Sequence, residues 1–294
     1  MSKKKPFNDL LDLLTQFSGN VTANGVGRAA IGGTASGNSA DISDLIRWLT
    51  SWQKSSLPKL DETHICIFVS SYEGESQQSE LKEFIDNAGK GKVPVGKLCK
   101  DRGVGLRVLE MAPEIPHVVS EKWPENHCMA AVGFGMEATA AEGNILGLAA
   151  LAPGDEKYCA AFCRSLMQNF IKNDQTNVKK SKNDASALDV LHRMKNSSGR
   201  EVAAMVGAMI AARSRNMPVL VEGWSAIAAL CVLKAIDPTS IDHVRVASVE
   251  SGDQITVIEA LGFHAIVGGV VDLGPGCGVA LAHSIITSLT NLAE

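Results

Sequence analysis

Residues Val270–Ala282 read VVDLGPGCGVALA, in which an apolar run gives way to a turn that contains Gly274, Gly276 and Gly278. The segment Val279–Leu292 that follows is typical of a helix. In α/β proteins an apolar strand, a glycine-rich turn and a helix can form an anion site, because the backbone comes close to a phosphate and the first N–H groups of the helix point at it. The alternative is a tight strand-to-helix turn without a ligand, which this stretch alone favours.

Other apolar runs of strand length alternate with helical segments along the chain. The runs that we assign to strands are Ile65–Val69, Leu106–Met111, Met129–Val132, Pro218–Val221, Val244–Ala247 and Ala265–Val271. Nearly continuous apolar runs indicate strands that are buried on both faces, and their alternation with helices predicts a parallel sheet of about six strands. The predicted fold class is therefore α/β, a doubly wound and mostly parallel Rossmann-like sheet.

Two segments before the first strand have apolar residues at helical spacing. They are Phe7–Phe17 and Ile42–Trp52, and the glycine-rich connection Ser18–Asn38 separates them. Because Pro58 ends the second segment, we predict a small helical portion over residues 1–58 and an α/β domain over 59–294.

Further helices are predicted from Gly133 to near Pro153, over Tyr158–Phe170 and over Glu201–Arg213. The polar stretch Lys172–Ala185 predicts a solvated loop, with a mobile lid as the functional alternative.

The composition restricts the classes of partner. Hydrophobic residues make up 45% of the chain, charged residues 20%, and the net charge is −4. Basic tracts are limited to Lys3–Lys5 and Lys179–Lys182, so we expect no nucleic acid partner. We expect no membrane span, since charged residues interrupt every apolar run, and no signal peptide, since MSKKKPFNDLL has no apolar region. The seven cysteines form no CxxC pair, and Cys159 and Cys163 are spaced for core packing, which favours the cytoplasm and no metal.

Ligands of doubly wound sheets bind beyond the carboxyl ends of the strands. The loops predicted at this edge are Ser70–Glu75, Gly133–Met136, Glu222–Gly223, Ser248–Gly252 and Gly274–Gly278. Three of them, which begin at Gly133, Ser248 and Gly274, place glycines or a hydroxyl ahead of a helix. A single such turn is commonly structural, but three together favour a nucleotide or phosphosugar ligand.

The segment 199–238, GREVAAMVGAMIAARSRNMPVLVEGWSAIAALCVLKAIDP, resembles the nicotinate-nucleotide:dimethylbenzimidazole phosphoribosyltransferases. That family has an Ala/Gly/Met-rich helix, then P-V-L-L-D-G-F, then an alanine-rich helix. Val132–Met136 is similar to its V-G-E-x-G-M, Ser248–Gly252 to its S-A-E-x-G, and Leu273–Ala282 to its L-G-E-G-S-G-A-A-L-A.

The resemblance implies transfer of phosphoribose from nicotinate mononucleotide to dimethylbenzimidazole or a related azole, in the synthesis of the lower ligand of cobalamin. It implies a homodimer and no cofactor. The residues that it implies for substrate binding are Gly133, Phe134, Gly135, Met136, Ser248, Glu250, Gly252, Gly274, Gly276 and Gly278.

The chain departs from the family at the general base. The glutamate of L-G-E-G, which deprotonates the incoming azole, is replaced by Pro275, which has no proton acceptor. Glu73 and Glu75 are the candidates for a substitute, with solvated surface acids as the alternative. Glu222 matches the family's aspartate in P-V-L-L-D-G-F and is expected to be structural.

Other family positions also differ. The glutamate of V-G-E-x-G-M falls in a one-residue deletion between Gly133 and Phe134, and Ser70–Gly74 replaces the family's A-D-H-G-V. The histidine ahead of S-A-E-x-G aligns with Val246, and we expect no counterpart of the C-terminal tail, because the sequence stops at Glu294.

Two classes of function follow. One is a phosphoribosyltransferase with altered base choice, or one that acts with a paralogous subunit that supplies the missing glutamate. The other is a catalytically inactive nucleotide- or azole-binding paralogue. We favour the transferase and expect a dimer, either with itself or with a paralogue.

Overall fold

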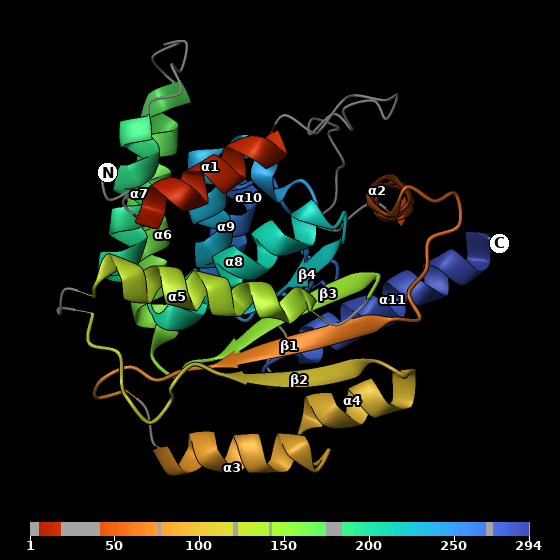
Figure 1. The fold of residues 1–294 in the computed structure, drawn as a ribbon. Helices are drawn as coiled ribbons and strands as arrows, with labels where there is room; N and C mark the ends of the chain where they lie inside the picture. The colour runs from red at the N-terminus through yellow and green to blue at the C-terminus, as the bar shows by residue number, and fades with distance from the viewer. Residues whose placement is uncertain are drawn as a thin grey trace.

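Five parallel strands form a single sheet in the order β2-β1-β3-β4-β5 in the computed structural model (Figure 1). The structure describes residues 6–18, 42–75, 78–119, 123–140, 143–174, 184–268 and 273–293. The strands are β1 (Thr63–Val69), β2 (Gly105–Glu110), β3 (Ile145–Leu151), β4 (Val219–Val221) and β5 (Val244–Val246). The predicted α/β class with a doubly wound parallel sheet is confirmed.

Alternate residues of β1 belong to two separate hydrophobic cores, one on each face of the sheet. Ile65, Ile67 and Val69 join one core, whereas Cys66 and Phe68 join the other. Side chains of a strand alternate between faces, so a strand in the middle of the sheet must be apolar at every position. This requirement explains the continuous apolar run from which the strand was predicted.

Helices cover both faces (Figure 1). The larger core contains side chains of α1 (Pro6–Ser18), α5 (Glu125–Met136), α6 (Asp155–Asp174), α7 (Asp184–Ser197), α8 (Arg200–Ser214), α9 (Gly223–Ile236) and α10 (Gly252–Ala260). The smaller core contains side chains of α2 (Ile42–Gln53), α3 (Gln78–Gly89), α4 (Pro94–Arg102) and α11 (Cys277–Ala293). Two short 3₁₀ helices, η1 (Glu137–Thr139) and η2 (Pro238–Ile241), complete the elements.

Helices α5 and α8 approach each other closely through glycine. A Cβ on Gly135 would collide with the backbone carbonyl of Ala204, and a Cβ on Gly207 would collide with the carbonyl of Val132. The glycine and alanine content of this part of the sequence therefore serves contact between two backbones.

The prediction of a strand at Met129–Val132 is wrong, because these residues lie inside α5. The helix predicted from Gly133 to near Pro153 is also wrong, since α5 ends at Met136 and Ile145–Leu151 forms β3. Short runs of small apolar residues fit either structure, and contacts with the rest of the protein decided between them.

The predicted sixth strand is not regular where the structure describes it. Ile266 donates its backbone N–H to Val246 at 3.0 Å and Val267 to Ala247 at 2.8 Å, so this segment lies beside the end of β5 without forming a strand up to Gly268. Residues 269–272, which include the start of the Val270–Ala282 stretch, lie outside the described residues.

Two other predicted segments also fall largely outside the described residues. One is the glycine-rich connection Ser18–Asn38, of which only Ser18, the last residue of α1, is described. The other is the polar stretch Lys172–Ala185, predicted as a loop: the structure places its first three residues in α6 and its last two in α7, and does not describe the rest.

The N-terminal helices contribute to both cores, α1 through Phe7, Leu10 and Leu14 and α2 through Leu49. The boundary at residue 58 stays a prediction. Among the described residues, no helix has the length and apolar character that crossing a membrane requires.

Candidate functional site

The strand order fixes where a ligand crevice is expected. Chain connections run outward in opposite directions from β1 and β3, so the topological switch point lies between these two strands. Their carboxyl ends lie at the left of Figure 1. The loops there are Ser70–Glu75 after β1 and 152–154 after β3, which leads into α6 at Asp155.

A fully buried carboxylate, Glu201 at the start of α8, lies at this edge. Ser70 Oγ donates to Glu201 Oε2 at 2.6 Å and Tyr72 OH donates to Oε1 at 2.5 Å. Ser225 Oγ lies 3.5 Å from the same Oε1. Hydrogen bonds of this kind offset the cost of removing a carboxylate from water. Burial and the negative charge of Glu201 raise the pKa of Tyr72 well above its usual value, so the phenol keeps its proton.

Asp155 belongs to the same network and is more accessible than Glu201. It is the first residue of α6 and is partly exposed. Ser225 Oγ donates to Asp155 Oδ2 at 2.6 Å, so Ser225 lies between the two carboxylates. Burial raises the pKa of Asp155 to about 7; the hydrogen bond from Ser225 acts against this shift, and the charges of Glu201 and Glu250 add to it.

Glu222, directly after β4, binds the N-terminal end of α11. Its carboxylate accepts hydrogen bonds from the backbone N–H of Gly276 and, at 2.7 Å, from that of Val279. Ser248 Oγ lies 3.4 Å from Glu222 Oε2. Burial raises the pKa of Glu222 to about 7, although these N–H groups favour the charged form. An anion does bind at this helix terminus, and that anion is a side chain of the protein.

The loop after β5 packs against the same helix end. A Cβ on Gly278 would collide with the Ser248 side chain, so this close approach requires glycine. Glu250 is exposed and is linked to Gln254 by a 2.7 Å bond from its backbone N–H and a 3.1 Å bond to its carboxylate. Ser251 Oγ, next to the N-terminus of α10, is buried and has no hydrogen-bond partner among the described residues.

Aromatic rings flank the Glu201 network. Tyr72 stacks on Tyr158 with 4.9 Å between ring centroids and a 15° interplanar angle, and His117 packs edge-on against both Tyr72 and Trp123. Burial, with the charge of Arg200, lowers the pKa of His117 to about 4, so this imidazole is neutral near pH 7. Asp155 lies one helical turn before Tyr158 and is therefore close to this group of rings.

Comparison with known proteins finds similarity to one group of phosphoribosyltransferases. A family model described as phosphoribosyltransferase matches residues 168–294. The nicotinate-nucleotide–dimethylbenzimidazole phosphoribosyltransferase of Sinorhizobium medicae (strain WSM419) is 28% identical over 316 residues, which cover 96% of this chain and 92% of the relative. The protein of the same name from Brucella anthropi is 27% identical over 278 residues, which cover 85% and 82%. Along most of its length the chain is thus similar to nicotinate-nucleotide–dimethylbenzimidazole phosphoribosyltransferases.

The fold matches that of a solved phosphoribosyltransferase. The crystal structure of the phosphoribosyltransferase of this name from Thermus thermophilus matches with a TM-score of 0.69 and 14% sequence identity, and the match covers 96% of this chain and 95% of that one. At this identity the likeness shows a shared fold.

Three of the five loops predicted at the ligand edge come together, and a fourth, Ser70–Glu75, follows β1 at the same edge. Glu222, Ser248 and the turn at Gly276 are in direct contact, and Gly223 faces Glu250. The fifth, Gly133–Met136, is not a loop but the end of α5, where Gly133 and Phe134 are exposed. The loop that follows β3 takes its place at the edge and contributes Asp155.

The substitute bases predicted for the missing family glutamate lie on the surface. Glu73 and Glu75 are both exposed, and Glu75 Oε1 accepts a 2.6 Å bond from Lys157, itself largely exposed. The sequence reasoning overlooked Glu201 and Asp155. Glu201 could have been noticed as an acid directly before the apolar run of α8, but Asp155 could not be placed while Ile145–Leu151 was assigned to a helix.

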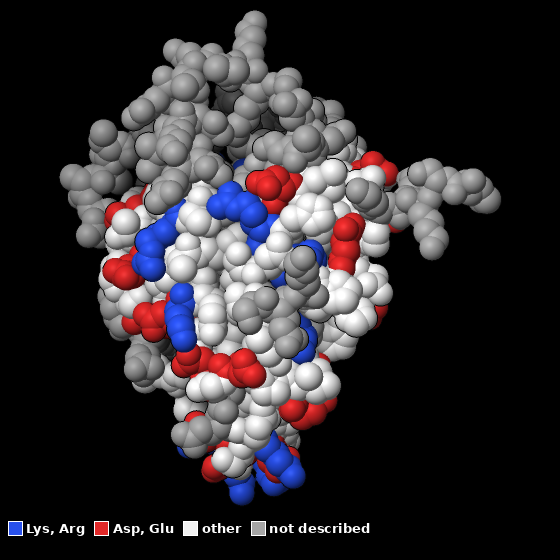
Figure 2. All heavy atoms as spheres, turned by 90° about the vertical axis from the view of Figure 1, so that its left-hand side faces the viewer, with Lys and Arg blue, Asp and Glu red and all other residues white. Residues whose placement is uncertain are grey.

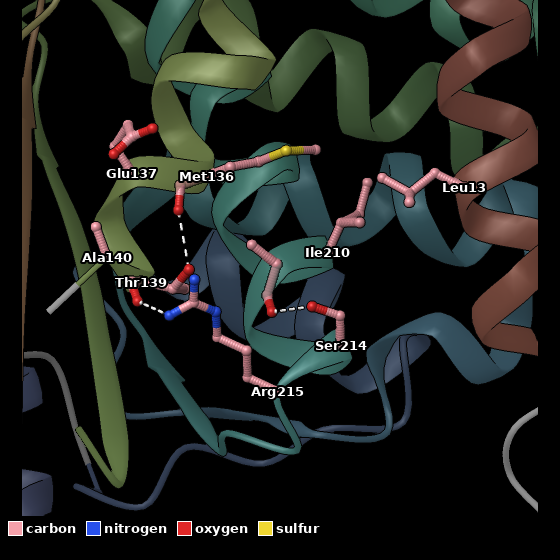
Figure 3. A pocket seen from close by; sticks show the side chains of 9 residues that line it. Leu13, Met136, Glu137, Thr139, Ala140, Ile210, Ser214 and Arg215 are labelled. Atoms are coloured by element: carbon pink, nitrogen blue, oxygen red, sulfur yellow. Dashed lines mark hydrogen bonds between the residues drawn. The ribbon is translucent and has the colours of Figure 1, made fainter. Parts of the chain in front are cut away.

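A hollow of about 280 Å³ lies elsewhere, between α1, α5, η1 and α8 (Figure 3). Two of its polar side chains bind backbone carbonyls: Arg215 donates to Thr139 O, and Ser214 Oγ donates to Ala211 O at 2.7 Å. On the face toward which the carboxyl ends of the strands point, acidic and basic side chains are interspersed (Figure 2). The described residues contain no cluster of His, Cys, Asp and Glu that could hold a metal ion.

Proposed function

We propose that this protein transfers the phosphoribosyl group of nicotinate mononucleotide to a ring nitrogen of dimethylbenzimidazole or a related azole. The observation that carries this proposal is the similarity, along 96% of the chain, to a phosphoribosyltransferase named for that nucleotide and that base. The switch-point edge, with acids, hydroxyls and aromatic rings, suits a phosphoribosyl ligand and a flat base.

The reaction separates charge at the anomeric carbon, so the protein must fix the phosphate, orient the base and accept a proton. The N-terminus of α10 suits the phosphate, because Ser251 Oγ and Gly252 lie there and a helix N-terminus favours an anion. Ser248 and Glu250 border this position. The remaining substrate contacts inferred from the resemblance, at Gly133–Met136 and Gly274–Gly278, stay proposals.

The test is a transfer assay on the full chain. The protein is incubated with nicotinate mononucleotide and dimethylbenzimidazole, benzimidazole or adenine at pH 6 to 9, and nicotinate and α-ribotide are measured by liquid chromatography and mass spectrometry. Equimolar formation of both products supports the proposal. Binding of the nucleotide without product at any pH supports the alternative, a catalytically inactive nucleotide- or azole-binding paralogue or partner subunit, which Pro275 favours.

We also propose a homodimer, or a heterodimer with a paralogue, in the cytoplasm. The dimer rests on the family resemblance alone, because the small-residue helices α8 and α9 are buried inside the subunit. The location is supported by the seven cysteines, all of which are free and buried. Light scattering at micromolar concentration tests the dimer, and a monomer mass would count against it.

A further inference from the structure

The proposed reaction needs a proton acceptor, and the family's glutamate position holds Pro275. The inference that follows rests on the proposed function. The acceptor must lie at the switch-point crevice, must be reachable by a substrate and must hold a proton reversibly near neutral pH.

Two buried acids at this edge already bind hydrogen-bond donors of the protein with both carboxylate oxygens. Glu201 is fully buried, and the hydroxyls of Ser70 and Tyr72 occupy its two oxygens. Glu222 is 3% exposed and its oxygens bind the backbone of α11. A substrate could reach either carboxylate only after these contacts had broken.

The acids Glu73, Glu75 and Glu250 are unsuitable for the opposite reason, because they are exposed to water. Glu73 is exposed on the outer part of the β1 loop, and Glu75 pairs with Lys157. Glu250 is exposed and is held by Gln254. Carboxylates that face water or pair with a neighbouring side chain are poorly placed to hold an azole N–H away from water.

Asp155 meets all three requirements. It is the first residue after the loop that borders the crevice, it is partly exposed, and one oxygen is fixed by the 2.6 Å bond from Ser225. We propose that Asp155 is the general base of the transfer, in place of the family glutamate, and that Ser225 positions it. Its raised proton affinity, which arises from burial beside Glu201 and Glu250, agrees with this role.

The transfer step conserves atoms and charge. The unprotonated ring nitrogen of the azole forms a bond to C1′ of the phosphoribosyl group while the bond from C1′ to the pyridinium nitrogen breaks. The bonding pair stays on that nitrogen, and nicotinate leaves with a neutral ring. Asp155 accepts the N–H proton of the resulting azolium and later releases it to water.

The test compares two neighbouring acids. Asp155→Asn keeps the shape and an oxygen for Ser225, and Glu156→Gln makes the same change at the adjacent, exposed position. Asp155→Asn should lower kcat about 10²- to 10⁴-fold, the usual contribution of a general base, whereas Glu156→Gln should stay within about twofold of the unaltered protein. Binding of nicotinate mononucleotide, measured by calorimetry, should be similar in all three proteins.

The unaltered protein provides a second readout that does not depend on the folding of a variant. Because the base must be deprotonated, kcat/KM should rise with pH up to about 7 and then level off. Ser225→Ala removes a hydrogen bond that favours the carboxylate, so the same rise should move to higher pH. A purely structural serine would lower activity without moving the profile.

The outcomes separate the two proposals. Transfer by the unaltered protein, with loss in Asp155→Asn and the expected profile shift in Ser225→Ala, supports Asp155 as the base. Transfer that survives Asp155→Asn within threefold overturns this assignment and leaves the proposed function intact. No transfer by the unaltered protein on any azole overturns both. Loss of activity in Glu73→Gln or Glu75→Gln, with Asp155→Asn active, would assign the base to the β1 loop.

Discussion

At the scale of single residues, Glu222 joins three segments that are far apart in the sequence. It follows β4, it lies beside Ser248 after β5, and it caps α11. A side chain that satisfies buried donors from another element is worth more to stability than an exposed one, because its removal leaves those donors without partners.

Glu222→Ala is therefore expected to lower the free energy of unfolding by about 2–4 kcal/mol, since two buried N–H groups lose their acceptor. The matched control is Glu73→Ala, an exposed glutamate, which should change the same quantity by less than about 0.5 kcal/mol. Urea unfolding monitored by circular dichroism measures both. Equal stabilities would show that the capping contacts contribute nothing.

A second residue-scale prediction uses the position of the family base. In an Asp155→Asn background, Pro275→Glu returns a carboxylate to that position, and glutamate can adopt the backbone angle that proline requires. The double variant should recover at least about tenfold of the transfer lost in Asp155→Asn. Pro275→Gln in the same background is the control, because it changes the backbone in the same way without a base. If both double variants recover equally, the gain comes from the backbone.

At this scale, the sequence predicted which residues lie close together but not what each residue does. It placed Glu222, Ser248 and Gly276 at one edge, where the structure brings them together. It expected a ligand at the glycine turn, whereas the structure shows that a carboxylate of the protein occupies two of its N–H groups. No local pattern could show this, because Glu222 and Gly276 are 54 positions apart.

At the scale of elements, the contact between α5 and α8 depends on the direction in which a Cβ at each glycine would project. Gly135→Ala is expected to destabilise the protein by about 1–3 kcal/mol, because the new methyl group would overlap the Ala204 carbonyl. Gly133→Ala in the same helix is the control: its Cβ meets nothing within 4 Å, and alanine favours helix by about 0.5–1 kcal/mol. Thermal unfolding should therefore move in opposite directions for the two variants.

Two short apolar segments show how far sequence periodicity can distinguish a helix from a strand. Both Met129–Val132 and Ile145–Leu151 are short, apolar and rich in small residues, yet one is helical and the other is a strand. Strands β1 and β2 were predicted within two residues, because β-branched and larger side chains make their pattern specific. Where alanine and glycine dominate, neighbours decide the conformation.

At the scale of the whole molecule, two acids with raised pKa values, the partly exposed Asp155 and the buried Glu222, make stability depend on pH. The pKa values of Asp155 and Glu222 are raised to about 7 in the folded state, so the unfolded chain releases these protons at lower pH. Their contribution to the free energy of unfolding is complete below about pH 4, falls as the pH rises to about 7 and is then constant. The expected loss is on the order of 1–3 kcal/mol for each group.

Urea unfolding at pH 5 and pH 8 tests this dependence. The difference between the two pH values should shrink in Asp155→Asn, which has no carboxyl group to titrate, and should persist in Glu156→Gln. An unchanged difference in Asp155→Asn would mean that its carboxyl group titrates normally in the folded protein.

Capping of α11 by a distant side chain also bears on the order in which the molecule assembles. The N–H groups of Gly276 and Val279 find their acceptor only once β4 has joined the sheet and placed Glu222 beside them. All strand pairs are parallel and join segments far apart in the chain, so they form late in folding. The start of α11 should thus become ordered after the centre of the sheet. Its amide hydrogens would then report, by their exchange with deuterated water, whether β4 has brought Glu222 to the helix.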